Sequence, residues 1–146
     1  MGNFKFNNNG ISPSLTETAK LKNFLASIFG SENIDFKSVS YIFCKDDFML
    51  GLNKEFLNHD TYTDIITFAL SAKNASINAE IYISVERVIE NALKLKNQCY
   101  DELLRVMIHG ILHLCGYSDH TPREKASMRE KENFYLSKWF HVKHSS

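Results

Sequence analysis

The strongest constraint on the fold is an almost entirely apolar stretch that contains two histidines. Residues 106–115 read Val-Met-Ile-His-Gly-Ile-Leu-His-Leu-Cys, and the only polar side chains among them are His109 and His113. A helix this apolar is typical of the buried centre of a domain. We expect it to span about Tyr100 to Cys115 and to end at Gly116, a residue type that favours helix termination.

The two histidines lie four residues apart, which places them one turn apart on the same face of that helix. A buried imidazole needs a partner, because an unsatisfied polar group in a core costs about 1–3 kcal/mol. One divalent metal ion would satisfy both rings at once. The alternative interpretation is a pair of core histidines that are hydrogen-bonded to the backbone or to carboxylates.

A short loop after this helix can supply a third metal ligand. Residues 121–124, Thr-Pro-Arg-Glu, form a capping-box pattern that predicts the start of the last helix and limits the loop to about 116–120. Asp119 and His120 therefore return toward the histidines, and either can coordinate. Three protein ligands with one open position are typical of catalytic zinc, which lowers the pKa of a bound water to about 7 and favours hydrolysis.

Two nearby residues limit the class of metalloenzyme and the set of possible metal ligands. The zinc-protease motif places a glutamate directly after its first histidine as general base, whereas this chain has Gly110 there. The sequence therefore does not match a standard metalloprotease. Cys115 is not expected to coordinate, because two residues beyond His113 its side chain points away from the histidine face.

The rest of the chain mixes helix and strand patterns, which suggests a two-layer or three-layer α/β arrangement. The predicted elements are a helix over about 13–29 that is capped by Ser12, strands over 38–44, 63–70 and 77–83, a short helix from Asp46 or Asp47, and a helix capped by Ser84. The positions expected to face inward on the helix from Asp46 or Asp47 and on the helix capped by Ser84 are Met49, Leu52, Phe56, Val85, Val88, Ile89 and Ala92. The charged run 123–131 is interpreted as a solvated helix face.

Composition excludes several classes of protein. Lys plus Arg and Asp plus Glu both number 17, so the net charge of zero argues against purely electrostatic binding to nucleic acid. The sequence contains no window of 18 apolar residues, so no transmembrane helix is predicted. Three widely spaced cysteines give no disulfide framework, and a reducing cytoplasm is the simplest compartment. We expect residues 1–146 to form one domain without a nucleotide cofactor.

These residues resemble a known family. His109-Gly-Ile-Leu-His-Leu-Cys-Gly-Tyr117, followed closely by Asp119-His120, is similar to the YbeY signature His-Gly-x-Leu-His-Leu-x-Gly-Tyr-Asp-His. Residues 52–53 and 60–68 resemble the family segment Leu-Asn…Asp-x-Pro-Thr-Asp-Val-Leu-Ser-Phe, and residues 79–84 resemble its Gly-Asp-Ile-x-Ile-Ser strand. The blocks occur in the family order.

The resemblance implies an α+β fold: a single domain with a small mixed β-sheet packed against several α-helices, and a zincin-like two-histidine helix at its centre. It implies one divalent metal ion, most often assigned as Zn²⁺, and a single-strand-specific endoribonuclease that uses a metal-activated water. The implied partners are rRNA and the small ribosomal subunit, and the implied roles are maturation of the 16S rRNA 3′ end and ribosome quality control.

The sequence departs from the family pattern at two functional positions. The segment after His113 is one residue longer, so a gapless match places Asp119 at the third-ligand position and His120 one residue beyond it. A two-histidine, one-carboxylate site also suits Fe(II). The family often has an arginine, thought to contact RNA, where this chain has Leu57.

Three further residues are candidates for catalysis or substrate binding. Asp64 is expected to support a metal-bound histidine or to transfer a proton, with a strand-end turn residue as the alternative. Arg105, one turn before His109, could bind a phosphate oxygen, although an exposed charge paired with a neighbouring acid is the simpler interpretation. His59 could contact RNA or be an ordinary solvated loop histidine.

The sequence also allows a function without catalysis. In that alternative the protein is a ribosome-assembly factor whose metal only organises the loop after Gly116. The missing glutamate at position 110 and the leucine at position 57 both favour it. A hydrolase with another small substrate is a third possibility.

Overall fold

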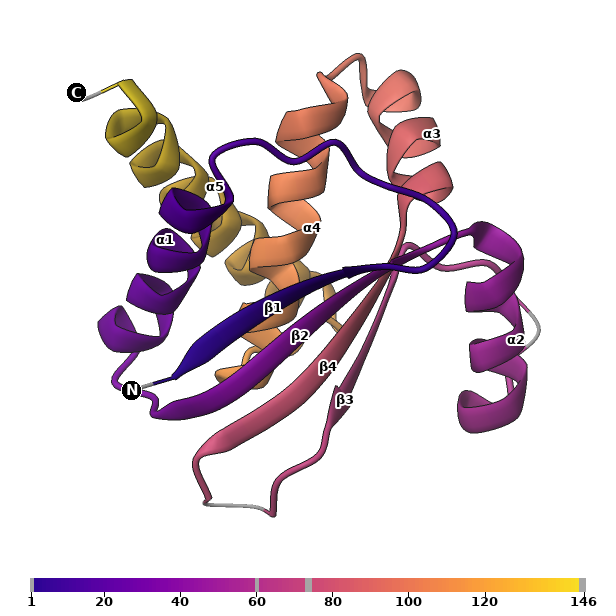
Figure 1. The fold of residues 1–146 in the computed structure, drawn as a ribbon, viewed down its shortest axis with the longest axis horizontal. Helices are drawn as coiled ribbons and strands as arrows, with labels where there is room; N and C mark the ends of the chain where they lie inside the picture. Colours follow the sequence, from indigo (N-terminus) through magenta and orange to yellow (C-terminus); the bar gives the residue numbers. More distant parts are fainter. Residues whose placement is uncertain (1, 60, 73–74, 145–146) are drawn as a thin grey trace.

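A mixed β-sheet forms the centre of the structure (Figure 1). The computed structural model describes residues 2–59, 61–72 and 75–144, and within them the strand order is β1-β2-β4-β3. β1 (Asn3–Asn8), β2 (Phe36–Cys44) and β4 (Ile77–Ser84) run parallel, whereas β3 (Ile65–Ala69) is an edge strand antiparallel to β4. This arrangement confirms the α+β class.

Helices cover both faces of this sheet. The helices are α1 (Thr18–Ser31), α2 (Asp46–Leu57), α3 (Val85–Leu95), α4 (Cys99–Leu114) and α5 (Pro122–His144). Alternation along β2 explains the layers, since Tyr41 and Phe43 face the core shared with α1, α4 and α5, while Ile42 and Cys44 face α2. The two-histidine helix α4 lies across the first face (Figure 1), as expected for a helix this apolar.

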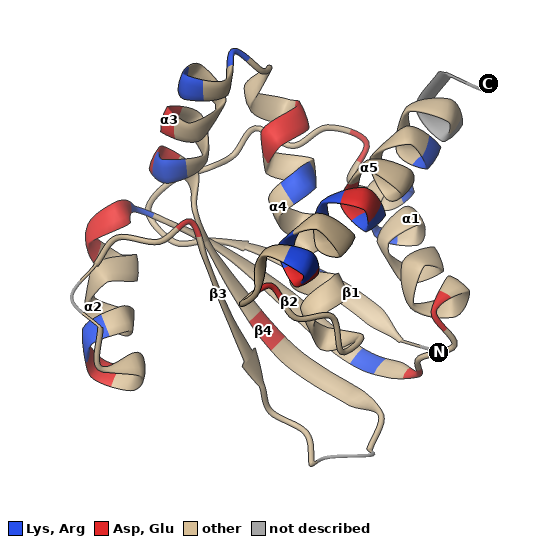
Figure 2. Ribbon diagram, turned by 180° about the vertical axis from the view of Figure 1, so that it is seen from behind, with Lys and Arg blue, Asp and Glu red and all other residues tan. Residues whose placement is uncertain are grey.

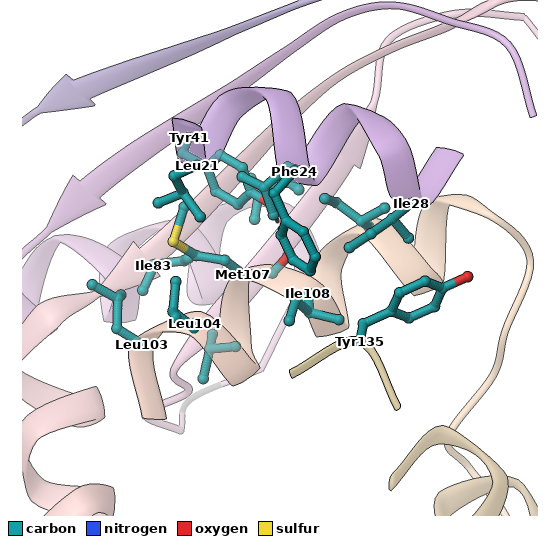
Figure 3. Packing of buried hydrophobic residues seen from close by; sticks show 14 of the residues in the cluster. Leu21, Phe24, Ile28, Tyr41, Ile83, Leu103, Leu104, Met107, Ile108 and Tyr135 are labelled. Atoms are coloured by element: carbon teal, nitrogen blue, oxygen red, sulfur yellow. Dashed lines mark hydrogen bonds between the residues drawn. The ribbon is translucent and has the colours of Figure 1, made fainter. Parts of the chain in front are cut away.

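The core forms where α4 is enclosed by β-strands and neighbouring helices. Figure 3 shows Met107 and Ile108 of α4 among side chains from α1, the sheet and α5. Tyr41, which is fully buried, satisfies its hydroxyl by donating a hydrogen bond to the Met107 carbonyl oxygen at 2.7 Å. This bond ties the sheet to α4 only two residues before His109.

Gly110 permits the close approach of α4 to the sheet. A Cβ atom at this position would lie 3.0 Å from the Cδ1 atoms of both Ile65 and Ile81. Any larger side chain would require these isoleucine side chains to shift. At the position that carries the glutamate of zinc proteases, this helix therefore packs closely against side chains of β3 and β4.

Some predicted boundaries were wrong for identifiable reasons. The first helix begins at Thr18, not near residue 13, because Ser14 and Glu17 adopt left-handed backbone conformations with φ of 56° and 51°. Helix α1 also continues to Ser31, one residue past the glycine expected to end it. The sequence analysis did not predict β1, in which only alternate residues face the core.

Two core predictions were also wrong. Phe56 is 58% exposed, although its ring meets the ring of Phe68 edge-on at 5.7 Å, and Ile89 is 41% exposed. In contrast, Asn53 of α2 is buried and its side-chain amide donates to the Thr61 carbonyl oxygen at 2.7 Å. This bond fixes the chain that leads to Asp64 and β3.

Acidic and basic positions are interspersed over the surface formed by α4 and α5. Figure 2 shows both signs along α4 and at the start of α5. Any charge-based recognition on the surface of α4 and α5 must therefore come from individual side chains.

In the part of the chain that the structure describes, we find no helix with the length and apolar character needed to cross a bilayer.

We expect Gly110→Val to destabilise the protein by about 2 kcal/mol, because overpacking a close helix–sheet contact costs about 1–3 kcal/mol. Gly51→Val is the matched control, since a Cβ at this exposed α2 position meets nothing within 4 Å. Urea unfolding measures both variants. Equal stability of the two would contradict the close-packing role of Gly110.

Candidate metal centre

The loop that follows α4 returns toward the helix as predicted. Gly116 has φ of 106°, and the Tyr117 backbone N–H donates to the Leu112 carbonyl oxygen at 3.0 Å, which closes the end of α4. The predicted capping box then starts α5: Glu124 N–H donates to Thr121 Oγ1 at 3.1 Å, and Thr121 N–H donates to Glu124 Oε1 at 2.9 Å.

Hydrogen bonds orient both histidine rings in the same way. His113 Nδ1 lies 2.9 Å from the Tyr117 carbonyl oxygen, which can only accept, so Nδ1 carries the hydrogen. His109 Nδ1 lies 2.7 Å from Glu132 Oε2 and donates to that carboxylate. Each ring therefore has Nε2 left for another interaction. Metal-binding histidines are usually oriented through the second ring nitrogen in this way.

Asp119 completes a compact group of possible metal ligands, His109, His113 and Asp119, which we call the ligand group. His109 Nε2 lies 3.3 Å from Asp119 Oδ2, and His113 Nε2 lies 3.5 Å from Asp119 Oδ1. One ligand atom from each of the three residues lies within 4.8 Å of the other two. Ligand atoms bound tetrahedrally to zinc are about 3.4 Å apart, from bond lengths of about 2.1 Å. The residues present thus fit one divalent ion.

Glu132 links α5 to the histidine helix. Its side chain is only 6% exposed, and its second oxygen, Oε1, accepts a hydrogen bond from Arg105 Nη1 at 3.0 Å. Arg105 Nη2 in turn donates to Asn133 Oδ1 at 2.8 Å. The carboxylate is therefore held between a cation and an imidazole, which fixes the ring plane of His109.

The charges around His109 favour a cation at this place. Burial alone would lower the pKa of His109, but the carboxylates of Glu132, Asp119 and Asp64 outweigh it and raise the pKa above its ordinary value. The pKa of Glu132 is in turn below its usual range, since His109 and Arg105 outweigh the effect of its burial. The field that stabilises an imidazolium would also stabilise a divalent ion beside Nε2.

A cleft of about 460 Å³ opens next to this group. Asp64 and Glu102 line it, and burial raises the pKa of each above its ordinary value. Asp64 lies immediately before β3, where its backbone carbonyl accepts a hydrogen bond from the Ser84 N–H at 3.0 Å. The exposed side chains of Lys125 and Arg129 line the same cleft and bring positive charge to its mouth. Acids, cations and the ligand group thus share one cavity.

The structure separates the predicted site residues into two sets. His109, His113, Asp119, Asp64 and Arg105 all line the cleft. The Arg105 guanidinium pairs with Glu132 and Asn133 of α5. Its role in phosphate binding stays a prediction.

The second set lies apart from the ligand group. His120 is exposed and its backbone N–H donates to Glu124 Oε1 at 3.1 Å, which places it in the cap of α5. His59 is exposed just after α2, and its contact with RNA stays a prediction. Cys115 remains a poor ligand candidate, because burial raises the pKa of its thiol to about 12.

A partly buried carboxylate fixes the loop that carries Asp119. Glu32, at the end of α1, accepts hydrogen bonds from the hydroxyls of Tyr117, at 2.8 Å, and Tyr135, and from Lys131 Nζ at 3.3 Å. Burial would raise the pKa of Glu32, but these donors outweigh it and lower the pKa below its ordinary value. Because Tyr117 also accepts from His113, this cluster connects α1 to the ligand group.

The sequence analysis missed Glu132 and Glu32. Glu132 follows the charged run 123–131 that was interpreted as solvated, yet it falls in line with the buried residues of α5, Met128, Tyr135, Leu136 and Trp139. A single acid within an apolar helical stripe is the signal that could have identified it. Glu32 has no comparable local pattern, since its partners lie at least 85 residues away.

The fold and this site define a protein with a two-histidine helix under a mixed sheet and a candidate divalent-metal centre at the edge of a cleft. A family model described as "Endoribonuclease YbeY" matches residues 5–140. Because that match spans most of the chain, the protein belongs to the YbeY family.

Named relatives agree with the family model. The chain is 46% identical to "Endoribonuclease YbeY" of Flavobacterium psychrophilum over 88% of this chain and 91% of the relative. It is 44% identical to the protein of the same name from Cytophaga hutchinsonii over 84% and 86% of the two chains. The solution structure of TM1509 from Thermotoga maritima is similar with a TM-score of 0.63 at 30% identity, covering 95% of this chain and 93% of that one.

We expect Glu132→Gln to weaken zinc binding by about 10-fold to 100-fold, because His109 loses the charged partner that orients its ring. Competition with a chromophoric chelator measures the affinity. Asn133→Ala is the control, since it removes the other partner of Arg105 and leaves the Glu132–His109 bond in place. Zinc affinity that is unchanged in Glu132→Gln would exclude this positioning role.

We expect Glu32→Gln to lower stability at pH 7 by about 1.5–3 kcal/mol, the range for hydrogen bonds to a charged group. The folded pKa of Glu32 lies below its ordinary value of 4.5, so its contribution is present above that pH and is lost as the pH falls through the folded pKa. The difference between wild type and variant should therefore shrink below pH 4.5.

Chemical unfolding at a series of pH values tests this expectation. Tyr117→Phe, which removes one of the donors to Glu32, should behave as an intermediate case. A stability difference that stays constant from neutral to acidic pH would show that the charge on Glu32 is not what stabilises the loop.

Proposed function

We propose that this protein is a metal-dependent endoribonuclease that cleaves single-stranded RNA, with the scissile phosphate placed beside His109, His113 and Asp119. The observation that carries the proposal is the convergence of two Nε2 atoms and one carboxylate at the wall of an open cleft. Membership of a family whose named relatives are endoribonucleases supports RNA as the substrate.

The finer assignment follows the family resemblance. We infer that residues 1–146 act as one cytoplasmic domain in maturation of the 3′ end of 16S rRNA and in ribosome quality control, with rRNA and the small subunit as partners. Zn²⁺ is the proposed ion, because two imidazoles and a carboxylate are donors that suit zinc. Fe(II) is the ion that the same donor set would take next.

Each residue in the cleft has a proposed task. A divalent ion at this place would supply Lewis-acid chemistry, by neutralising phosphate charge and lowering the pKa of a coordinated water. Asp64, a half-buried carboxyl with a raised pKa, is suited to accept and return a proton within the cleft. Arg129 and Lys125 are placed to bind phosphate oxygens.

The choice of Asp119 over His120 as the third ligand is part of the proposal. Asp119 has carboxylate oxygens 3.3 Å and 3.5 Å from the two Nε2 atoms, whereas His120 is exposed and lies outside that group. This selection agrees with the gapless match to the family signature. It also gives the donor set one more negative charge than a three-histidine site would have.

We expect the zinc-loaded protein to cleave a labelled RNA that contains a single-stranded 16S 3′ segment, and His113→Ala to reduce the rate at least about 100-fold because the ion contributes several kcal/mol to catalysis. His141→Ala is a matched control, since this exposed histidine lies near the end of α5. Gel electrophoresis of the products measures the rates.

Two results would overturn the proposal. Cleavage that continues unchanged in His113→Ala would show that the metal centre is not the source of activity. RNA binding without any cleavage, in a nuclease-free preparation loaded with zinc or Fe(II), would favour the non-catalytic assembly factor instead.

A further inference from the structure

A second hollow runs along the open edge of β3, on the other side of the candidate metal centre from the cleft. Its volume is about 570 Å³, and the residues that line it include Leu57, Ile65, Thr67, Leu114 and His120. Within the described residues β3 pairs only with β4, so its outer edge borders this hollow. We call it the β3 groove.

The β3 groove is continuous with the cleft. Ile65, His113 and Asp119 line both hollows. His113 and Asp119 therefore stand between them. A chain whose cleaved bond lies at these residues can extend into both hollows, because a phosphodiester has a nucleotide on each side.

The two hollows differ in the charged side chains that line them. The cleft contains the acids Asp64, Glu102, Asp119 and Glu132 together with three cations, Arg105, Lys125 and Arg129, of which Arg105 is paired with Glu132. Among the described residues that line the β3 groove there is no lysine or arginine, and most of them are aliphatic. Single-stranded RNA combines anionic phosphates with flat bases that have apolar faces and polar edges. The cations that can meet a phosphate therefore lie in the cleft, and the aliphatic surface that suits a base lies in the groove.

We propose that the β3 groove is a nucleobase subsite, in which Leu57, Leu114 and His120 hold one base next to the scissile phosphate. This inference rests on the proposed endoribonuclease function. It also bears on two departures from the family pattern, since the leucine in place of an arginine and His120, which lies one residue beyond the third-ligand position, line the same groove.

The groove offers contacts for both parts of a base. Leu57, which is 45% exposed, and Leu114, which is partly buried, provide aliphatic surface for its faces. The exposed His120 ring provides a flat surface for stacking, and the Thr67 hydroxyl can donate to or accept from a base edge. Stacking on protein rings does not depend strongly on base identity. The subsite should therefore favour unpaired nucleotides more than a particular sequence.

The test compares two fluorescent probes on the zinc-loaded protein: a single-stranded oligouridine and an abasic ribose-phosphate chain of the same length. Fluorescence anisotropy gives their affinities, and a gel run after each titration verifies that the probes are intact. We expect wild type to bind oligouridine about 10-fold more tightly, because one base contributes about 1–3 kcal/mol through stacking.

Variants in each hollow should separate the two contributions. His120→Ala and Leu57→Ser should weaken oligouridine binding several-fold and leave the abasic probe unaffected, whereas Arg129→Ala should weaken both probes equally. Leu93→Ser is the matched control, since this leucine is 73% exposed on α3. Zinc content, measured for each variant, distinguishes a lost base contact from a lost metal ligand.

The outcomes distinguish this inference from the function on which it rests. If neither probe binds, both the subsite and the RNA-directed function are wrong. If both probes bind equally, and His120→Ala and Leu57→Ser change neither affinity, the RNA-directed function stands and the nucleobase subsite is wrong. The same result is expected if the groove instead accepts a peptide strand along β3. Loss of zinc in His120→Ala would also overturn the subsite, since His120 would then be a ligand.

Discussion

The candidate metal centre depends on how two imidazole rings are held at the edge of a buried helix. Each Nδ1 donates to a fixed acceptor, Glu132 for His109 and the Tyr117 carbonyl for His113. Both Nε2 atoms are therefore directed at Asp119, in an arrangement that suits one cation. Because each acceptor belongs to a different part of the fold, the centre can exist only when α4, α5 and the loop between them are packed together.

Packing of α4 makes this orientation possible. Gly110 allows the helix to lie against Ile65 and Ile81. The hydrogen bond from the Tyr41 hydroxyl to the Met107 carbonyl oxygen holds α4 against the sheet. Removing water from the back of the helix leaves its histidine face directed toward the cleft. Fold and candidate site therefore depend on the same helix, because the apolar sequence of α4 provides both the core and the rigid support for the candidate ligands His109 and His113.

The sequence could predict those features that depend on local patterns. The apolar helix with His109 and His113 and the capping box that shortens the next loop were predicted, since each is encoded within a few residues. Glu32 and Glu132 could not be placed in the same way, because their partners are distant in the chain. The late start of α1 depends on the left-handed backbone at Glu17, which has no sequence signal comparable to a glycine.

The most direct test of this account is a crystal structure of the zinc-loaded protein with anomalous data collected at the zinc edge. The account requires one zinc ion bound by Nε2 of His109, Nε2 of His113 and the carboxylate of Asp119, with a remaining position open to solvent. An ion bound by His120, an ion closed off by a fourth protein ligand, or no ion at these residues at saturating zinc would contradict it.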